Sequence, residues 1–427
     1  MASTRRSKKL IKPPPSAQIA ELLIPNHFRC PISLDLMMDP VIVSTGITYD
    51  RRSIEAWLDM GNSTCPVTNQ ELVPDDVIPN HSLRRLIQDW CVAHRSHGIE
   101  RIPTPKIPIT ASRATEILSE LSNNRVRAHE LVTKVKSLTK ESERNRRCFA
   151  AAGAARVLAA LFSELASCNK SAFDGVFDEI LSTMICFLPL DHDNCWHLGS
   201  RDSLKSIVLI LKFGELASRL NAVAVLRELL STNKDAVRVA TQTDGLIESL
   251  IELIRKPISP RATKASLAAS YFLISASEES ATRSVELGLV PLVLELLVDS
   301  DKAMCEKVLA LFDAVCSCER GREAAYGHAL AVPVLVKKMF RVSDGATEFV
   351  VSALWKLIKN YKEEERGGVL FEAMQAGAFH KVLLLLQVGC SGGAKEKATE
   401  LLKIMNGSKD KFECIDVMDF KGLKRAF

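Results

Sequence analysis

The sequence predicts a mainly α-helical protein, made of a small α+β module near the N-terminus followed by a long superhelix of helical repeats. Three observations support this. Leu and Ala dominate the second two-thirds of the 427 residues, and only 6% of the chain is aromatic, which favours helix. Short glycine-containing motifs recur in that part. Before them, two β-branched runs flank a glycine turn and two amphipathic helices follow.

Residues 1–21 carry the excess charge of the chain. Lys and Arg number 56 and Asp and Glu 51, and five of the basic residues lie in the first twenty positions, which hold no acid: Arg5, Arg6, Lys8, Lys9 and Lys12. Without these five, 51 basic residues balance 51 acidic ones, which argues against a nucleic-acid-binding face. The tail could be a nuclear-targeting signal or a membrane-surface contact, but we favour a disordered, solvated segment.

Compartment is indicated by what the sequence lacks. No apolar run of a secretory signal begins the chain, and no stretch of eighteen apolar residues could span a membrane. The twelve cysteines have no disulfide-framework spacing, so we expect reduced thiols. We expect a protein without a transmembrane segment that is cytoplasmic and that could also enter the nucleus.

Residues 22–97 have the local signals of a compact α+β module. The segment Ser44-Thr45-Gly46 lies between two short β-branched runs and predicts a β-hairpin. Asp50 is suited to cap a helix that ends near Gly61, and Asn80 is suited to cap a second helix.

This module has single cysteines where a zinc-stabilised module would have Cys-x-x-Cys pairs. They occur in Cys30-Pro31-Ile32-Ser33 and in Cys65-Pro66-Val67-Thr68. A neutral hydroxyl is a poor zinc ligand but a good hydrogen-bonding group. We therefore expect no metal and no cofactor, with side-chain hydrogen bonds and a compact core in their place.

The ordered set of motifs across this module resembles the U-box, the metal-free relative of the RING finger. The motifs are Phe28-Arg29-Cys30-Pro31-Ile32, Met38-Asp39-Pro40-Val41, Gly46, Thr48-Tyr49-Asp50-Arg51, Ile54, Trp57, Cys65-Pro66, Thr68, Leu72, Pro74, Pro79-Asn80 and Leu83. The resemblance implies a ubiquitin ligase that docks a ubiquitin-charged conjugating enzyme and promotes transfer to a substrate lysine by proximity. No catalytic residue is then expected on this chain.

The resemblance also assigns a docking surface. Ile32, Trp57 and Pro66 would form a shallow apolar groove for the conjugating enzyme, although Ile32 and Trp57 could instead be core residues. Asn69 stands where some family members have an Arg that contacts both the conjugating enzyme and ubiquitin. Activation could therefore be weaker here, or organised differently.

Other motif residues are assigned to the scaffold that replaces zinc. Cys30 and Cys65 could be nucleophiles or ligands, but we interpret them as packed thiols. Hydrogen bonds or helix caps are expected from Asp39, Tyr49, Asp50, Arg51 and Asn80.

A proline-containing linker is expected at 98–112, helical repeats at 113–410 and a C-terminal tail at 411–427. The repeat motifs have anchors at residues 153, 199, 245, 288, 330 and 377, which gives intervals of 46, 46, 43, 42 and 47. This spacing lies in the window of armadillo and HEAT repeats. The repeats resemble armadillo repeats, particularly those found behind the U-box in plant proteins.

By this resemblance, the groove of the repeats would bind the protein substrate. Armadillo proteins that grip extended peptides have a recurring Asn on successive inner helices. The matching positions here are assigned to Glu228, Leu273 and Lys356, so the Asn ladder is missing. We expect a folded partner or a different motif as the substrate.

The sequence leaves three hypotheses. The first is a plant U-box–armadillo ubiquitin ligase, a family in which roles in defence and stress signalling are common. The second is a non-catalytic armadillo scaffold with an inactive U-box. The third is a zinc RING, which would require bound metal. A metal site in the segment 192–197 is not favoured, because no second cluster completes it.

Overall fold

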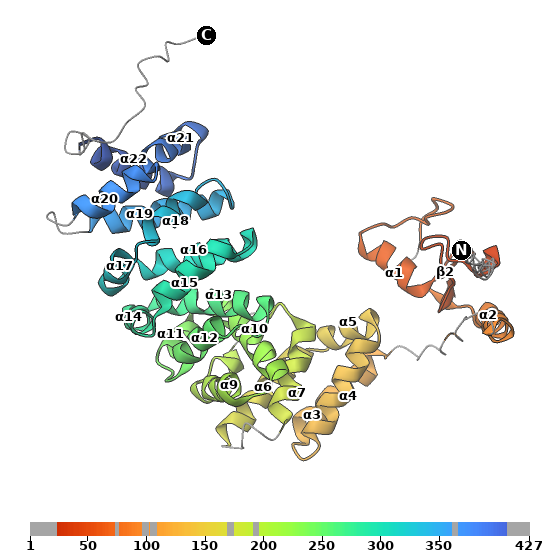
Figure 1. Cartoon of the computed structure of the whole chain (residues 1–427). Helices are drawn as coiled ribbons and strands as arrows, with labels where there is room; N and C mark the ends of the chain where they lie inside the picture. Colours follow the sequence, from red (N-terminus) through yellow and green to blue (C-terminus); the bar gives the residue numbers. More distant parts are fainter. Residues whose placement is uncertain are drawn as a thin grey trace, which may run out of the picture. The chain divides into compact units, whose positions relative to one another are not determined.

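The structure, a computed structural model, describes residues 24–72, 77–95, 102, 109–168, 175–190, 196–360 and 366–407. The chain divides into two compact units, residues 1–107 and 108–427 (Figure 1). The predicted fold class is confirmed: the chain is mostly helical, with one small sheet in the N-terminal unit. The expected tails at 1–21 and 411–427 and most of the expected linker at 98–112 lie outside the described residues.

The N-terminal unit combines a three-stranded antiparallel sheet with two helices. Its elements are η1 (Asn26–Phe28), β1 (Pro40–Ile42), β2 (Thr48–Asp50), α1 (Arg51–Asp59), β3 (Ile78–Pro79) and α2 (His81–Ala93). The strand order is β2-β1-β3, and Val41 of β1 lies opposite both Tyr49 and Pro79. The hairpin closes at Gly46, which takes a φ of 78° that a side chain would disfavour.

The core of this unit is small and is drawn from every element around the sheet. Tyr49 of β2, Ile54 of α1 and Ile87 of α2 are completely buried, as are Cys30 and Cys65. A core of this size buries little apolar area, so the polar contacts around it contribute a large share of the stability.

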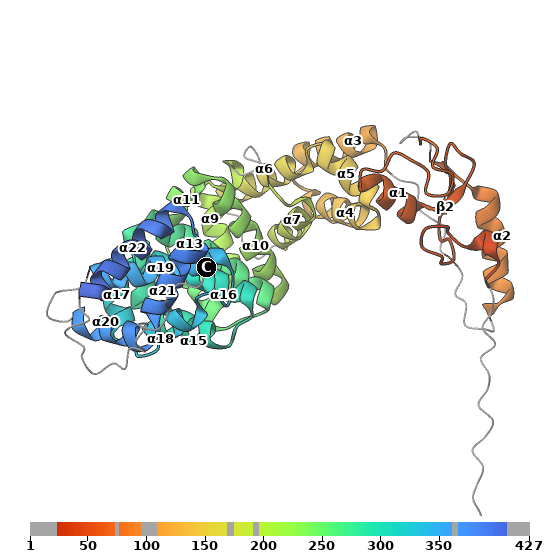
Figure 2. The same cartoon turned by 90° about the horizontal axis from the view of Figure 1, so that it is seen from above.

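The second unit is a row of helices, and Figures 1 and 2 show it as a curved stack. Its described elements are α3 (Ala111–Asn123), α4 (Ala128–Glu141), α5 (Glu143–Ala151), α6 (Ala154–Ser167), α7 (Val176–Met184), η3 (Ile185–Phe187), α9 (Arg201–Phe213), α10 (Leu216–Thr232), α11 (Lys234–Thr241), α12 (Leu246–Arg255), α13 (Pro260–Ala276), α14 (Glu278–Glu286), α15 (Leu289–Asp299), α16 (Lys302–Val315), α17 (Glu319–Tyr326), α18 (Ala331–Lys338), α19 (Asp344–Lys359), α20 (Arg366–Gln375), α21 (Ala378–Val388) and α22 (Gly392–Gly407). From α11 onward they form three-helix repeats.

The third and longest helix of each repeat packs against its counterpart in the next repeat. The successive pairs are α10 with α13, α13 with α16, α16 with α19, and α19 with α22. Because each repeat covers the apolar face of its neighbour, one core extends along the stack.

The register of these third helices corrects one sequence alignment. Three of them carry a buried pair near the C-terminal end: Leu229-Leu230, Leu273-Ile274 and Leu357-Ile358. The residues that precede these pairs are Glu228, Phe272 and Lys356. Leu273, only 1% exposed, is therefore one residue out of register with Glu228 and Lys356, and Phe272 holds the equivalent position.

Four of the six predicted anchors are left-handed glycines. Gly153, Gly245, Gly288 and Gly377 each precede the second helix of a repeat with φ between 78° and 85°. The degenerate anchors differ: α9 begins after Ser200, whose side chain accepts a hydrogen bond from the Ser203 amide, and α18 begins after Leu330 with φ −87°.

Several consecutive helices are joined by a single residue. Ser142, Asn233 and Ser277 each end one helix and begin the next, and each side chain accepts a hydrogen bond from the amide three residues later. One polar side chain thus turns the chain and caps the following helix without a loop.

Among the described residues, no individual helix has both the length and the apolar character needed to cross a membrane. Two helix pairs, each sharply bent at the break, satisfy the criterion by length and composition alone: Glu143–Ala151 with Ala154–Ser167, and Gly368–Gln375 with Ala378–Val388.

Candidate functional site

The first Cys-Pro loop of the N-terminal unit is a tight turn closed by its own backbone. The Cys30 amide donates to the Asp35 carbonyl at 2.9 Å, and the Leu34 amide donates to the Cys30 carbonyl at 2.8 Å. Leu34 takes a left-handed φ of 61° and is 68% exposed. A bulky residue in this conformation is uncommon, and the closed turn holds it there.

The second Cys-Pro loop repeats this geometry thirty-five residues later in the sequence. The Cys65 amide donates to the Gln70 carbonyl at 2.8 Å, and the Asn69 amide donates to the Cys65 carbonyl at 2.8 Å. Asn69 takes a φ of 58°, a conformation that Asn tolerates better than most residues. The backbone role of Asn69 in closing this loop was not visible from the sequence.

The two cysteine sulfurs are buried acceptors of hydrogen bonds. The Asp50 amide donates to Cys30 Sγ at 3.2 Å. Cys65 Sγ lies 3.0 Å from the Tyr49 hydroxyl oxygen and accepts from the Thr45 hydroxyl at 3.4 Å. No group of three or more His, Cys, Asp or Glu side chains within the described ranges is arranged to hold a metal ion.

These contacts shift the acidity of the buried groups. Burial raises the pKa of Cys65, but hydrogen bonds from the hydroxyls of Thr45, Thr68 and Tyr49 outweigh it and lower that pKa to about 6. Burial and the neighbouring Cys65 raise the pKa of Tyr49 well above its usual range. For Cys30, burial opposes backbone hydrogen bonds from Ser33 and Asp50, and its pKa is lowered.

Trp57 links α1 to the second loop. Its indole Nε1 donates to the Thr64 carbonyl at 2.8 Å, and its own carbonyl accepts from the Asn62 side-chain amide at 3.0 Å. The side chain packs on the core of the unit but is only half-buried. The indole is therefore held in one orientation with part of its surface open to solvent.

The other predicted docking residues are also accessible. Ile32 and Pro66 are half-buried, and Asn69 is exposed. Ile32 packs on the same core as Trp57, whereas Pro66 follows Cys65 in the loop to which the indole is tethered. The structure thus leaves these side chains in contact with solvent. Their role in docking stays a prediction.

Asp50 does not cap α1 in the way predicted from its position. It lies at the N-cap, yet its side chain makes no capping bond. Instead its Oδ1 accepts from the Met38 amide at 2.8 Å and the Asp39 amide at 2.9 Å. Asp50 therefore fixes the turn before β1.

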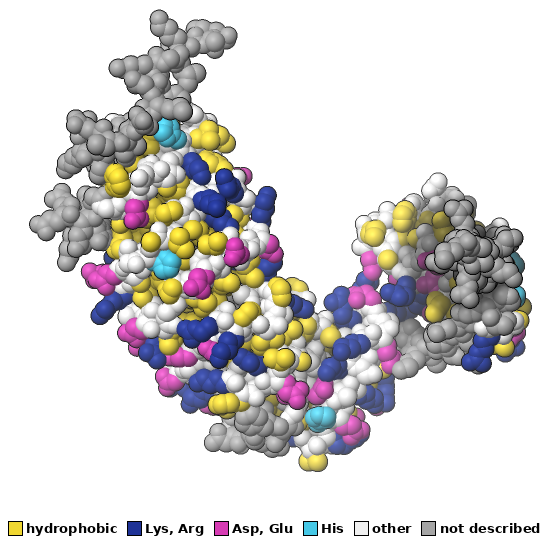
Figure 3. Space-filling view, in the orientation of Figure 1, with side chains coloured by type: hydrophobic (Ala, Val, Ile, Leu, Met, Phe, Trp, Pro, Cys, Tyr) yellow, Lys and Arg dark blue, Asp and Glu magenta, His cyan; other side chains and the backbone are white. Residues whose placement is uncertain are grey.

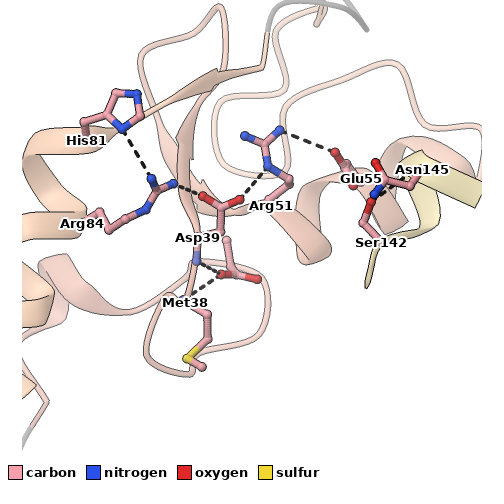
Figure 4. A network of polar contacts seen from close by, with 9 residues as sticks. Met38, Asp39, Arg51, Glu55, His81, Arg84, Ser142 and Asn145 are labelled. Carbon is pink, nitrogen blue, oxygen red and sulfur yellow. Dashed lines mark hydrogen bonds and ion pairs between the residues drawn. The ribbon is translucent and has the colours of Figure 1, made fainter. Parts of the chain in front are cut away.

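The Asp39 carboxylate joins two arginines at the centre of the unit (Figure 4). Arg51 Nε donates to Oδ2 at 2.7 Å, and Arg84 pairs with Oδ1. The side chains of Arg51 and Arg84 are each 11% exposed and that of Asp39 is 19% exposed. This ion triad ties α1 and α2 to the turn before β1.

Asn80 completes the scaffold by joining α2 to the sheet. Its Oδ1 accepts from the Leu83 amide at 3.0 Å, its Nδ2 donates to the Thr48 hydroxyl at 3.3 Å, and its backbone amide donates to the Pro40 carbonyl at 2.8 Å. A single amide side chain therefore caps the helix and contacts β2.

Sequence reasoning overlooked Arg84. It lies on the same face of α2 as Ile87 and Cys91, both completely buried. An arginine at helical spacing with buried residues needs an acidic partner, so the pattern could have indicated a buried ion pair, although not that Asp39 forms it.

Comparisons with known proteins agree with this geometry. The U-box domain profile matches residues 24–96, and the profile described as "Plant U-box protein ARM repeat region" matches residues 111–424. The fold of the repeats is also similar to a crystal structure of an engineered protein, with TM-score 0.53, 15% identity, and coverage of 69% of this chain and 68% of that one.

Similar curated proteins come from Arabidopsis thaliana. "U-box domain-containing protein 21" is 41% identical over 99% of both chains. "E3 ubiquitin-protein ligase PUB23" is 35% identical over 90% of this chain and 93% of its own length, and "E3 ubiquitin-protein ligase PUB22" is 34% identical over 90% and 94%. The chain therefore belongs to the plant U-box proteins that carry armadillo repeats.

Proposed function

We propose that this chain is an E3 ubiquitin ligase whose U-box docks a ubiquitin-charged conjugating enzyme, while its armadillo repeats bind the substrate. The observation that carries the proposal is the half-buried Trp57 indole, tethered to the Thr64 carbonyl beside the second Cys-Pro loop. A fixed aromatic side chain with an open face is typical of the anchor of a small, reversible interface.

Ubiquitin transfer would need no nucleophile on this chain. The conjugating enzyme carries the thioester, and the substrate lysine attacks it, so the ligase supplies proximity and orientation. Cys30 and Cys65 are completely buried, which suits a structural role better than a covalent one. We further propose that the protein is cytoplasmic and can also enter the nucleus. By analogy with its family, we propose a role in defence or stress signalling.

Autoubiquitination with purified activating enzyme, a panel of conjugating enzymes and the full chain tests the proposal. Trp57→Ala should abolish chain formation while the circular dichroism spectrum stays unchanged. Leu86→Ala is the matched control, because it removes another accessible apolar side chain of the U-box, 56% exposed on α2. It should retain activity.

The alternative is a non-catalytic scaffold with an inactive U-box. Wild-type protein that forms no chains with any conjugating enzyme would favour the scaffold. Equal loss of activity in both variants would show that Trp57 has no special role in docking.

A further inference from the structure

A small cavity between two armadillo repeats is lined by four cationic side chains. Its volume is about 140 Å³, and it is bounded by the end of α15, the start of α16, and α18 with the segment that follows it. The four cations are Lys302, Lys337, Lys338 and Arg341, and no acidic side chain lines the cavity.

Lys338 is held inside this cavity rather than extended into solvent. Its ammonium donates to Cys305 Sγ at 3.2 Å and to the Val298 carbonyl at 3.5 Å. An ammonium has three N–H donors, so one remains for a further acceptor. Cys305 is 1% exposed, and this contact therefore fixes the charge at the inner wall.

The other three cations are available for a ligand. Lys302, Lys337 and Arg341 are exposed, and none forms an ion pair within the described part of the chain. Asp301, next to Lys302, is not part of the lining; its carboxylate accepts from the Met304 amide at 2.6 Å and shares its charge with Lys264 at 3.3 Å.

The surroundings carry charge of both signs. Glu306 Oε2 accepts from the hydroxyl of Ser343, the residue after the lining residue Val342, at 3.1 Å, and Lys381 lies beside α18. Burial and the charge of Arg341 lower the pKa of Lys381, whose ammonium donates to the Val336 carbonyl at 2.5 Å. Figure 3 shows Lys and Arg side chains gathered over the repeats around α18. Four cations that line one cavity, with no acidic side chain in the lining, favour an anion that would neutralise them.

We propose that this cavity binds the phosphate group of a phosphorylated serine or threonine in a protein captured by the repeats. A phosphate monoester has a charge of roughly −1.5 to −2 and three strong acceptor oxygens, which matches a cavity lined by four cations better than one carboxylate does. The walls formed by Val298, Val334 and Val342 suit the short apolar stem of such a side chain.

A membrane phosphate is the competing source of this chemistry. Membrane binding through charge needs an extended basic face, whereas beyond the first twenty residues the 51 basic and 51 acidic residues of this chain balance. A single compact cavity favours one phosphate on a peptide. The inference that this cavity selects substrates for ubiquitination rests on the proposed ligase function. The inference that the cavity binds phosphate does not depend on that function.

The test measures binding of fluorescein-labelled degenerate peptides with a fixed central phosphoserine to the full chain by anisotropy. The double variant Lys302→Ala/Arg341→Ala should bind about tenfold more weakly or worse, because two charge-assisted contacts are removed. Inorganic phosphate should compete, and the serine peptides should not bind.

The matched control is Lys234→Ala/Arg238→Ala, which removes two exposed, unpaired cations from α11 within the described part of the chain. It should bind as the wild type does. The proposal would be overturned by equal loss in the control, by equal binding of serine peptides, or by binding only to phosphatidylcholine vesicles that contain phosphatidylinositol phosphate.

Autoubiquitination separates this site from the ligase function. Lys302→Ala/Arg341→Ala should retain chain formation, whereas Trp57→Ala should lose it and still bind the phosphopeptides. Phosphopeptide binding by a chain with no ligase activity would leave the cavity assigned and the ligase proposal refuted.

Discussion

The Cys65 thiol lies at the meeting point of three hydroxyl groups, inside a unit whose core contains few large side chains. A cysteine in such surroundings can act as a hydrogen-bond acceptor, as it does towards the Thr45 hydroxyl at 3.4 Å. A zinc-binding relative would have a second thiolate at the position of Thr68. In this chain the Thr68 hydroxyl instead donates a hydrogen bond to Cys65.

This arrangement predicts a pH dependence of stability. The folded pKa of Cys65 is about 6, below the value of about 8.5 for an unfolded thiol. The thiolate contribution is therefore fully present above about pH 8.5, declines as the pH falls, and is lost below about pH 6. Calorimetry of the U-box transition from pH 5.5 to 8.5 should show rising stability in the wild type and a flatter profile in Cys65→Ser.

The control for this prediction is Cys91→Ser, another completely buried cysteine of the same core, which lies on α2 outside both loops. It should destabilise the unit but keep the wild-type slope with pH. The same slope in all three proteins would show that Cys65 stays protonated.

At the level of secondary-structure elements, the repeats depend on glycines that turn the chain from one helix into the next. Gly288 has a φ of 80°, and its nearest side-chain atom lies 3.9 Å from where a Cβ would be. Glycine is therefore favoured at position 288 because of the left-handed backbone conformation, and not because a side chain would clash with its neighbours. Gly345, near the start of α19, has no atom within 4 Å of an added Cβ and no left-handed φ.

Substitution by alanine should therefore have opposite effects at these two positions. Gly288→Ala should cost about 1–2 kcal/mol, because a residue with a Cβ is strained in the left-handed region. Gly345→Ala should stabilise by about 0.5–1 kcal/mol by lowering the entropy of the unfolded chain. Urea midpoints followed by the helical circular dichroism signal measure both, and a shift in the same direction would contradict the argument.

Local chemistry explains what the sequence predicts well. The helix cap at Asn80 and the turns at Gly153 and Gly245 need only a few neighbouring residues, and their residue types indicate them directly. Asp50 and Arg84 were not predictable in this way, because their partners lie eleven or more residues away. The cationic cavity draws on two segments of neighbouring repeats, 298–305 and 334–342, so no short sequence window contains it.

At the scale of the whole molecule, the two units have separate hydrophobic cores. The smaller unit is stabilised by the triad in which the Asp39 carboxylate forms ion pairs with two mostly buried arginines, Arg51 and Arg84. Loss of one partner in such a group leaves uncompensated charge at a cost of about 3 kcal/mol or more, a large share of a small domain's stability.

Asp39→Ala should consequently unfold the U-box at a lower temperature and leave the repeat transition in place. Calorimetry of the full chain separates the two transitions. Glu130→Ala is the control, since its ion pair with Arg127 is exposed (64% and 47%) and should contribute no more than about 1 kcal/mol. If both transitions moved together in Asp39→Ala, the units would not be independent.

The one-residue connections at Ser142, Asn233 and Ser277 leave little freedom between the helices that they join. Each is one residue long, and its side chain caps the following helix. The backbone amides of Asn233 and Ser277 also bond the preceding helix, so an inserted residue would break a cap and rotate the helices beyond it. At these three places the angle between consecutive helices is therefore set by the chain itself, and the curvature there should not change when a partner binds.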